Sequence, residues 1–183
     1  MKNRMKKGDG TIGCLQHLPT EEEVVLGETT GARTVAKEKR IFISSPEFKE
    51  LDVPAEPTGE VSLSCFKLRK GRKPQMATIV RHLAKDPAAL AFTQDQMIGV
   101  LLDGPMAKFW PKTESDQLVF YLLITVRDTL YLVSFCWDTT MAVGAERFSG
   151  KESFSPGLFR MIVPKLESLP SAPPYPDASM KKP

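Results

Sequence analysis

The stretch DQLVFYLLITVRDTLYLVSFCWD, residues 116–138, carries the clearest structural pattern in this chain. Two runs of apolar, β-branched and aromatic residues lie on either side of the polar Arg127-Asp128-Thr129. Two such runs joined by a short polar turn are typical of a β-hairpin. The first run is apolar at successive positions, which is typical of a strand covered on both faces. We therefore expect the hairpin to lie in the middle of the fold.

Upstream of the hairpin, two segments predict further strands. Residues 60–68 alternate, because Val61, Leu63 and Cys65 share one face while serines occupy the other. This alternation is typical of a half-buried strand. Residues 40–48 read as another strand that Pro46 ends, and residues 52–59 read as a loop.

Two helices are predicted between these strands and the hairpin. Apolar residues recur at helical spacing at Met76, Ile79, Val80 and Leu83, and residues 86–91 add a short helical turn. Thr93 and Gln96 have the spacing of a capping box, which marks the start of the second helix. The sequence Asp103-Gly104-Pro105 predicts its end.

After the hairpin, residues 139–154 read as a loop with room for one short strand. Ser155 then predicts the N-cap of a third helix, with Pro156 at its first position. Its expected buried face is formed by Phe159, Ile162, Val163 and Leu166.

Together these elements predict one α+β domain, with a central β-hairpin or sheet packed by two to three helices. We expect three parts: a flexible basic N-terminal arm over residues 1–39, a core domain over residues 40–169, and a proline-rich tail over residues 170–183. The 183-residue chain is long enough to bury a sizeable core.

Charge and cysteine content narrow the broad class. The net charge of +3 is mild and does not by itself imply a nucleic-acid partner. The three cysteines, Cys14, Cys65 and Cys136, are few and widely spaced, which favours a reducing compartment over a disulfide framework. The longest apolar run, residues 118–126, is too short for a membrane-spanning helix, so we expect any membrane contact to be peripheral.

Catalytic signatures are weak. The chain has no phosphate-binding loop, dinucleotide fingerprint, zinc-protease motif or nucleophile elbow. Cys14 and His17 have C-x-x-H spacing, but a zinc site needs two more ligands. We expect Cys65 and Cys136 to be core residues and His82 to be solvated on the polar face of its helix. The sequence therefore favours a non-enzymatic protein and predicts no cofactor and no metal.

Basic residues gather around the first predicted helix. They are Lys67, Arg69, Lys70, Arg72, Lys73, Arg81 and Lys85. If the fold brings them onto one face, that face can neutralise the phosphates of a nucleic acid or of lipid headgroups. One hypothesis is therefore an intracellular nucleic-acid-binding regulatory domain with RNA or DNA as its partner. An ordinary solvated helix face remains the alternative for each single residue.

A second basic group lies at the N-terminus, where Lys2, Arg4, Lys6 and Lys7 precede the first acidic residue. Each basic residue near an anionic leaflet contributes about 1 kcal/mol to binding. Four residues predict weak, reversible attachment to an anionic membrane surface, which many copies in a lattice strengthen by avidity.

The tail LPSAPPYPDA, residues 169–178, is rich in proline, which excludes helix and inner strand and favours an extended polyproline II conformation. Within it, Pro170, Ser171, Ala172 and Pro173 match the pattern P-[S/T]-A-P. This tetrapeptide resembles the late domain through which enveloped viruses recruit the host ESCRT-I complex. A preformed polyproline II segment loses little entropy when it docks into an aromatic-lined groove.

The late-domain match, the basic arm and the small α+β core together resemble the matrix proteins of rhabdoviruses and related negative-strand RNA viruses. In rhabdovirus proteins this motif usually lies in the N-terminal arm, whereas here it lies near the C-terminus. The resemblance implies a structural protein that self-associates as an oligomer or lattice, contacts the viral nucleocapsid and recruits ESCRT-I for budding. It also implies a location beneath the virion envelope, and in the host cytoplasm at the inner face of a membrane.

Overall fold

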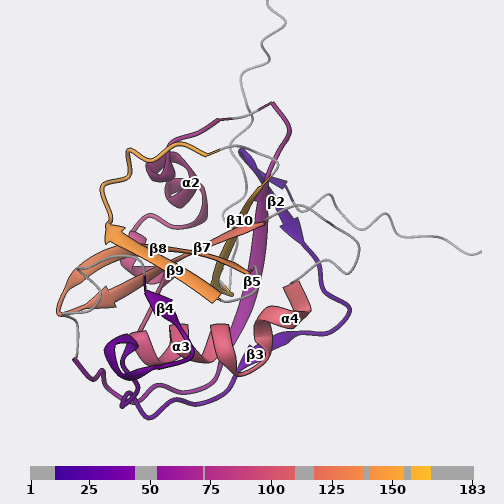
Figure 1. The fold of residues 1–183 in the computed structure, drawn as a ribbon. Coiled ribbons are helices and arrows are strands. Elements are labelled where there is room, and N and C mark those ends of the chain that lie inside the picture. Colours follow the sequence, from indigo (N-terminus) through magenta and orange to yellow (C-terminus); the bar gives the residue numbers. More distant parts are fainter. Residues whose placement is uncertain are drawn as a thin grey trace, which may run out of the picture.

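The computed structural model describes residues 11–43, 53–71, 73–109, 118–137, 141–154 and 158–165. These residues form one mixed α+β domain in which helices cover both faces of a single β-sheet (Figure 1). The expected fold class, with a central sheet packed by helices, is confirmed.

The predicted hairpin forms the centre of this sheet. Strand β7 (Val119–Val126) and strand β8 (Thr129–Trp137) pair antiparallel along their length. Arg127 and Asp128 make the turn, at φ 46° and 61°. Two successive positive φ values give a turn whose twist matches that of the flanking strands. The apolar side chains of β7 enter the buried clusters on both faces of the sheet, as its continuous apolar pattern predicted.

The sheet contains ten strands, eight of which follow the order β1-β2-β5-β10-β7-β8-β9-β4. The strands outside the hairpin are β1 (Thr11–Ile12), β2 (Leu15–Leu18), β3 (Val24–Leu26), β4 (Phe42–Ile43), β5 (Val61–Leu68), β6 (Ala91–Phe92), β9 (Met141–Arg147) and β10 (Phe159–Pro164). Strand β3 pairs with β5, and β6 pairs with β7, outside this order. The predicted strand over 60–68 is thus confirmed as β5, which pairs with three neighbours.

Helix α2 (Met76–Leu83) lies over one face of the sheet, together with the short 3-10 turn η2 (Pro87–Leu90). The four residues of its predicted apolar stripe are the ones that it buries. They pack against Phe66 of β5 and Met161 of β10 within one buried cluster. We call this surface of the sheet the α2 face.

Helices α3 (Gln94–Leu102) and α4 (Pro105–Phe109) lie over the opposite face, here called the α3 face (Figure 1). The predicted capping box is present at the start of α3. The Thr93 hydroxyl accepts from the Gln96 backbone N–H at 3.2 Å, and the Gln96 side chain accepts from the Thr93 backbone N–H at 2.9 Å. The helix ends at Asp103 as predicted.

The predicted third helix is wrong, because residues 159–164 form strand β10 instead. This strand lies between β5 and β7, antiparallel to the first and parallel to the second. Phe159 and Val163 enter the cluster on the α2 face, while Ile162 enters the cluster on the α3 face. In a short run that is apolar at nearly every position, helical spacing is satisfied by chance and does not exclude a doubly covered strand. The predicted cap at Ser155 and Leu166 of the predicted buried face lie outside the described residues.

The prediction of a flexible arm over residues 1–39 is wrong for residues 11–39. This segment contributes β1, β2, β3 and the 3-10 turn η1 (Val35–Lys37) to the fold. Its buried residues include Ile12, Cys14, Leu15, Val24, Leu26 and Val35. The apolar pieces are only two to four residues long and lie among charges, so they become strands only by pairing with one another and with β5.

Three further segments differ in smaller ways from what their sequences predict. Residues 141–147 form the full strand β9 rather than mostly a loop. Helix α4 was not predicted, because Gly104 and Pro105 read only as the end of the preceding helix. Of the predicted strand over 40–48, Phe42–Ile43 pairs with β9, and residues 44–48 lie outside the described residues.

Candidate functional site

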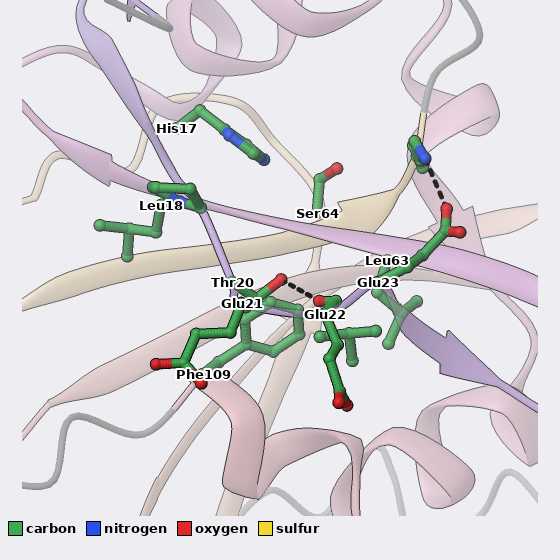
Figure 2. A pocket seen from close by; sticks show the side chains of 12 residues that line it. His17, Leu18, Thr20, Glu21, Glu22, Glu23, Leu63, Ser64 and Phe109 are labelled. Carbon is green, nitrogen blue, oxygen red and sulfur yellow. Dashed lines mark hydrogen bonds and ion pairs between the residues drawn. The ribbon is translucent and has the colours of Figure 1, made fainter. Parts of the chain in front are cut away.

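A groove of about 290 Å³ opens beside β5, between the stretches of this strand that pair with β2 and with β3 (Figure 2). Its lining residues are His17, Leu18, Pro19, Thr20, Glu21, Glu22, Glu23, Val24, Leu63, Ser64, Phe109 and Lys165. We refer to it as the β5 groove. Another hollow, of about 280 Å³, lies elsewhere in the described part of the chain.

The pairing of the strands explains why the groove forms there. Strand β2 pairs with residues 65–68 of β5, whereas β3 pairs with residues 61–63. Ser64 is therefore left between the two paired stretches. The connection from Pro19 to Glu23 passes over this interruption rather than continuing either ladder, so it leaves a hollow between itself and the sheet.

The floor of the groove is apolar. Val24, Leu63 and Phe109 belong to the buried cluster on the α3 face, and Leu18 packs against the same cluster. Phe109 comes from the end of α4, so the unpredicted helix supplies part of the floor. An apolar floor of this kind favours a ligand or partner with at least one hydrophobic group.

Three consecutive glutamates form the rim. The Lys165 ammonium donates to Glu23 Oε1 at 2.5 Å, and the Lys108 ammonium donates to Glu22 Oε2 at 3.1 Å. Figure 2 shows the Glu23 side chain pointing in a different direction from the side chains of Glu21 and Glu22. Hydrogen bonds from Lys165 and Ser62 hold the pKa of Glu23 below its ordinary value. Glu21 has no hydrogen bond or ion pair with any described residue, so none of these residues compensates its negative charge on the rim.

His17 forms one wall of the groove. Its ring lies 5.2 Å from the ring of Phe66, centroid to centroid. Burial lowers the pKa of His17 below its ordinary value, so the imidazole is neutral at pH 7. The groove therefore combines an acidic rim with an apolar floor, which suits binding of an apolar group that carries positive charge. The His17 and Ser64 side chains alternate with Leu18 and Leu63 along their strands, so they point to the opposite side of the sheet from this floor (Figure 2).

The basic residues singled out in the sequence do not all lie on one face. Arg81 and Lys85 are exposed beside the buried stripe of α2, and Arg69, Lys70 and Lys73 are exposed in the connection between β5 and α2. Lys67 alternates along β5 with Phe66 and Leu68, whose side chains enter the cluster on the α2 face. Because successive side chains of a strand point to opposite faces, Lys67 lies on the other side of the sheet from Arg81. Arg69, Lys70, Lys73, Arg81 and Lys85 are all exposed in α2 or in the segments that flank it, and we refer to these five residues as the basic face.

The other predicted site residues lie outside the described residues. These are Lys2, Arg4, Lys6 and Lys7 of the N-terminal arm, Arg72, and the tetrapeptide Pro170, Ser171, Ala172 and Pro173. The last described residue before the tetrapeptide is Lys165, at the rim of the β5 groove.

The expectation of a solvated His82 is wrong. Its side chain is half-buried, and its Nε2 atom is shielded from solvent with no hydrogen-bond partner among the described residues. A Cβ atom on Gly13 would come within 2.6 to 2.7 Å of three atoms of this ring. The imidazole thus packs against the β1–β2 turn, a contact between distant segments that helical periodicity does not reveal.

The cysteines differ in their surroundings. Cys65 is buried as expected, and desolvation raises its pKa to about 12, so it is a thiol at neutral pH. Cys14 is also buried, whereas Cys136 is half-buried on β8. No group of three or more histidine, cysteine, aspartate or glutamate side chains in the described ranges is placed to hold a metal ion.

Sequence reasoning missed the β5 groove because it assigned the Glu21-Glu22-Glu23 run to a flexible arm. The available signal was the apolar Val24-Val25-Leu26 directly after that run, which proves to be β3. None of the described helices is long and apolar enough to cross a membrane. Comparison with known proteins gave no match to a family model, to a curated protein or to a solved structure.

Proposed function

We propose that this protein is a non-enzymatic, matrix-like structural protein that recruits the ESCRT-I complex through its tail. The observation that carries the proposal is the sequence Pro170-Ser171-Ala172-Pro173, which follows Lys165 by five residues. In the wider role, copies of the domain self-associate under an anionic membrane and contact a viral nucleocapsid. The protein then acts beneath the envelope of the virion and at the inner face of a host membrane.

The position of Lys165, five residues before the motif, supports the display of this motif. The Lys165 backbone N–H still donates to the Ser62 carbonyl oxygen at 2.7 Å, so the chain is held to β5 up to this residue. The Lys165 side chain is exposed at the rim of the β5 groove. Five residues span at most about 17 Å when extended. A partner that holds Pro170 therefore lies close to the acidic rim of the groove.

The test is binding of the full chain to the ubiquitin-variant domain of ESCRT-I. The double substitution Pro170→Ala with Pro173→Ala is expected to weaken binding at least about tenfold, because it removes both the polyproline II bias and the ring contacts. Isothermal titration calorimetry measures this affinity directly. Pro176→Ala, which changes a proline of the same tail outside the tetrapeptide, is the matched control and is expected to bind like the unchanged chain.

Two results would contradict the proposal. The first is that the unchanged chain shows no saturable binding to the ubiquitin-variant domain. The second is that the Pro170/Pro173 double variant binds this domain as tightly as the Pro176→Ala control. Circular dichroism of each variant establishes that the folded domain is retained. If the tetrapeptide binds ESCRT-I but the double variant releases particles as well as the unchanged chain, the motif binds ESCRT-I without a role in budding.

A second candidate function, binding of RNA or DNA, is favoured by the basic face. Its five described residues make no hydrogen bond or ion pair through their side chains with any described residue. Positive charges without such partners remain available to neutralise phosphates. They would also suit the anionic headgroups that the matrix role requires.

If the basic face binds nucleic acid, the binding affinity is expected to decrease steeply as the salt concentration rises. The triple substitution Arg69→Gln, Arg81→Gln and Lys85→Gln is expected to reduce the slope of log K against log salt by about 3, because each lost phosphate contact removes about one unit. Fluorescence anisotropy with labelled RNA and DNA at several salt concentrations measures the slope. Lys39→Gln, Arg147→Gln and Lys151→Gln remove the same charge from exposed positions elsewhere. Equal slopes for both triple variants would reject the basic face as a nucleic-acid site.

A further inference from the structure

A second cavity, of about 280 Å³, lies on the α2 face of the sheet, away from the β5 groove. It is lined by Tyr121, Leu132, Ser134, Gly144, Ala145, Glu146 and Phe154. These residues come from the three neighbouring strands β7, β8 and β9 and from the segment that follows β9. We call it the Glu146 cavity.

The register of the strands explains the hollow. Tyr121 of β7 lies opposite Ser134 of β8, and Ser134 lies opposite Gly144 of β9. The size of the side chain therefore decreases along this row, from the aromatic ring of Tyr121 to the hydroxymethyl group of Ser134 to Gly144, which has no side chain. In the next row, Leu132 lies opposite Glu146, which places a carboxylate beside the hollow.

One wall of the cavity is aromatic. The Tyr121 ring lies 4.7 Å from the Phe154 ring in an edge arrangement and 5.0 Å from the Phe159 ring in a stacked one, centroid to centroid. Phe154 and Phe159 are 5.1 Å apart, so the three rings form one cluster. Mutual packing holds Tyr121 and Phe154 in place at the cavity without a ligand.

Glu146 supplies the charge. It is the one charged residue among those that line the cavity, and it makes no hydrogen bond or ion pair with any described residue. Burial raises the pKa of Tyr121, and the Glu146 carboxylate raises it further, as expected when the carboxylate is close to the phenol. An anionic ligand would be repelled by this carboxylate, whereas a cation would be attracted both by it and by aromatic ring faces.

We propose that the Glu146 cavity binds an ammonium-type cation, either a lysine side chain or a methylated ammonium group. The volume is at the small end of the range for ligand pockets, which suits a single side chain or a small molecule. Ser134 and Tyr121 add hydroxyl groups that can accept hydrogen bonds from a primary ammonium. This site is independent of the tail and of the proposed ESCRT-I contact.

The experiment titrates the isotope-labelled full chain with choline and follows the backbone amide resonances of Gly144 and Ala145. The control ligand is 3,3-dimethylbutan-1-ol, which has the shape of choline but no charge. We expect saturable shifts with choline and at least about fivefold weaker binding of the neutral alcohol. N-acetyl-lysine amide forms a third arm: tighter binding of this probe assigns the site to protein lysines, and tighter binding of choline assigns it to methylated ammonium groups.

Two variants test whether the Glu146 carboxylate contributes to choline binding. Glu146→Gln keeps the shape of an exposed side chain and is expected to weaken choline binding at least about fivefold. Glu21→Gln removes a carboxylate from the rim of the β5 groove and is expected to leave it unchanged. The proposal is overturned if the alcohol binds as tightly as choline, if Glu146→Gln binds choline normally, or if the Gly144 and Ala145 resonances do not shift.

Discussion

Replacing Asp95 with alanine is expected to lower the free energy of unfolding by about 3 kcal/mol. The Asp95 side chain is 1% exposed, and its Oδ1 accepts from Arg33 Nε at 2.5 Å. Its other oxygen accepts from Thr30 Oγ1 and from the Arg33 backbone N–H, each at 3.4 Å. Removing the carboxylate leaves these donors without their partner, and the remaining charge of Arg33 is only 35% exposed. Urea denaturation followed by circular dichroism measures the change.

Helix α3 adds to this effect. Asp95 lies in the first turn of α3, where a negative charge interacts favourably with the helix dipole. The expected loss lies at the lower end of the range for broken buried pairs, because Arg33 keeps its second partner, Asp103 Oδ2, at 2.7 Å.

Asp103→Ala is the matched control for Asp95→Ala. Asp103 pairs with the same guanidinium, but its side chain is 46% exposed. Exposed ion pairs contribute at most about 1 kcal/mol, so this variant is expected to be nearly as stable as the unchanged chain. If the two substitutions lower stability equally, burial of Asp95 does not determine the strength of the interaction, and our account of it is wrong.

Replacing Gly31 with alanine is expected to lower the free energy of unfolding by about 3 kcal/mol as well. Gly31 has φ +77°, a conformation that other residues rarely adopt. An added Cβ atom would lie 2.0 Å from the carbonyl oxygen of Ala55. Because that oxygen belongs to the backbone, the clash is relieved only when the two segments separate. Separation would break the hydrogen bond from the Ala55 N–H to the Gly31 carbonyl oxygen and strain the neighbouring bridge between Thr29 and Thr58.

Gly27 provides the matched control in the same segment. A Cβ atom at this position would meet no atom within 4 Å. Gly27→Ala is therefore expected to leave stability unchanged or to raise it by up to about 1 kcal/mol, through the loss of unfolded-state entropy. Thermal unfolding of both variants under the same conditions gives the comparison. Equal midpoints for Gly31→Ala and Gly27→Ala would contradict the close approach of Gly31 to Ala55.

The substitutions Asp95→Ala and Gly31→Ala together test whether residues 11–39 form a folded segment or a flexible arm. Arg33 and Gly31 lie within residues 11–39, where the sequence predicted an arm. A flexible arm would tolerate Gly31→Ala, and Asp95 would have no partner to lose. In the structure, Gln94 of α3 also holds this region, because its amide oxygen accepts from the Val35 backbone N–H and its amide nitrogen donates to the Val53 carbonyl oxygen, both at 3.2 Å.

The elements that could be predicted are those whose signals are local and long. The hairpin was predictable because each of its strands is eight or nine residues long and the turn between them is polar. Helix α2 was predictable because four apolar residues repeat at helical spacing. The start of α3 was predictable because Thr93 and Gln96 satisfy each other's backbone across a single turn.

The candidate sites were less predictable, because each combines segments that are distant in sequence. The β5 groove needs Glu21 to Glu23, Ser64, Phe109 and Lys165. The Glu146 cavity needs the register that places Tyr121, Ser134 and Gly144 in one row. In both cases the individual residues are ordinary, and only strand pairing gives them a common surface.

The α+β class, the central hairpin, the first two helices and the proline-rich motif could each be recognised without a structure, because the information for each lies within a few neighbouring residues. The three-dimensional contacts were needed to establish that residues 159–164 are a strand and that residues 11–39 contribute to the core. The physical reason is that a short apolar segment has no secondary structure of its own. Its backbone groups find hydrogen-bond partners, and its side chains find a core, only when β5 and β7 are already beside it.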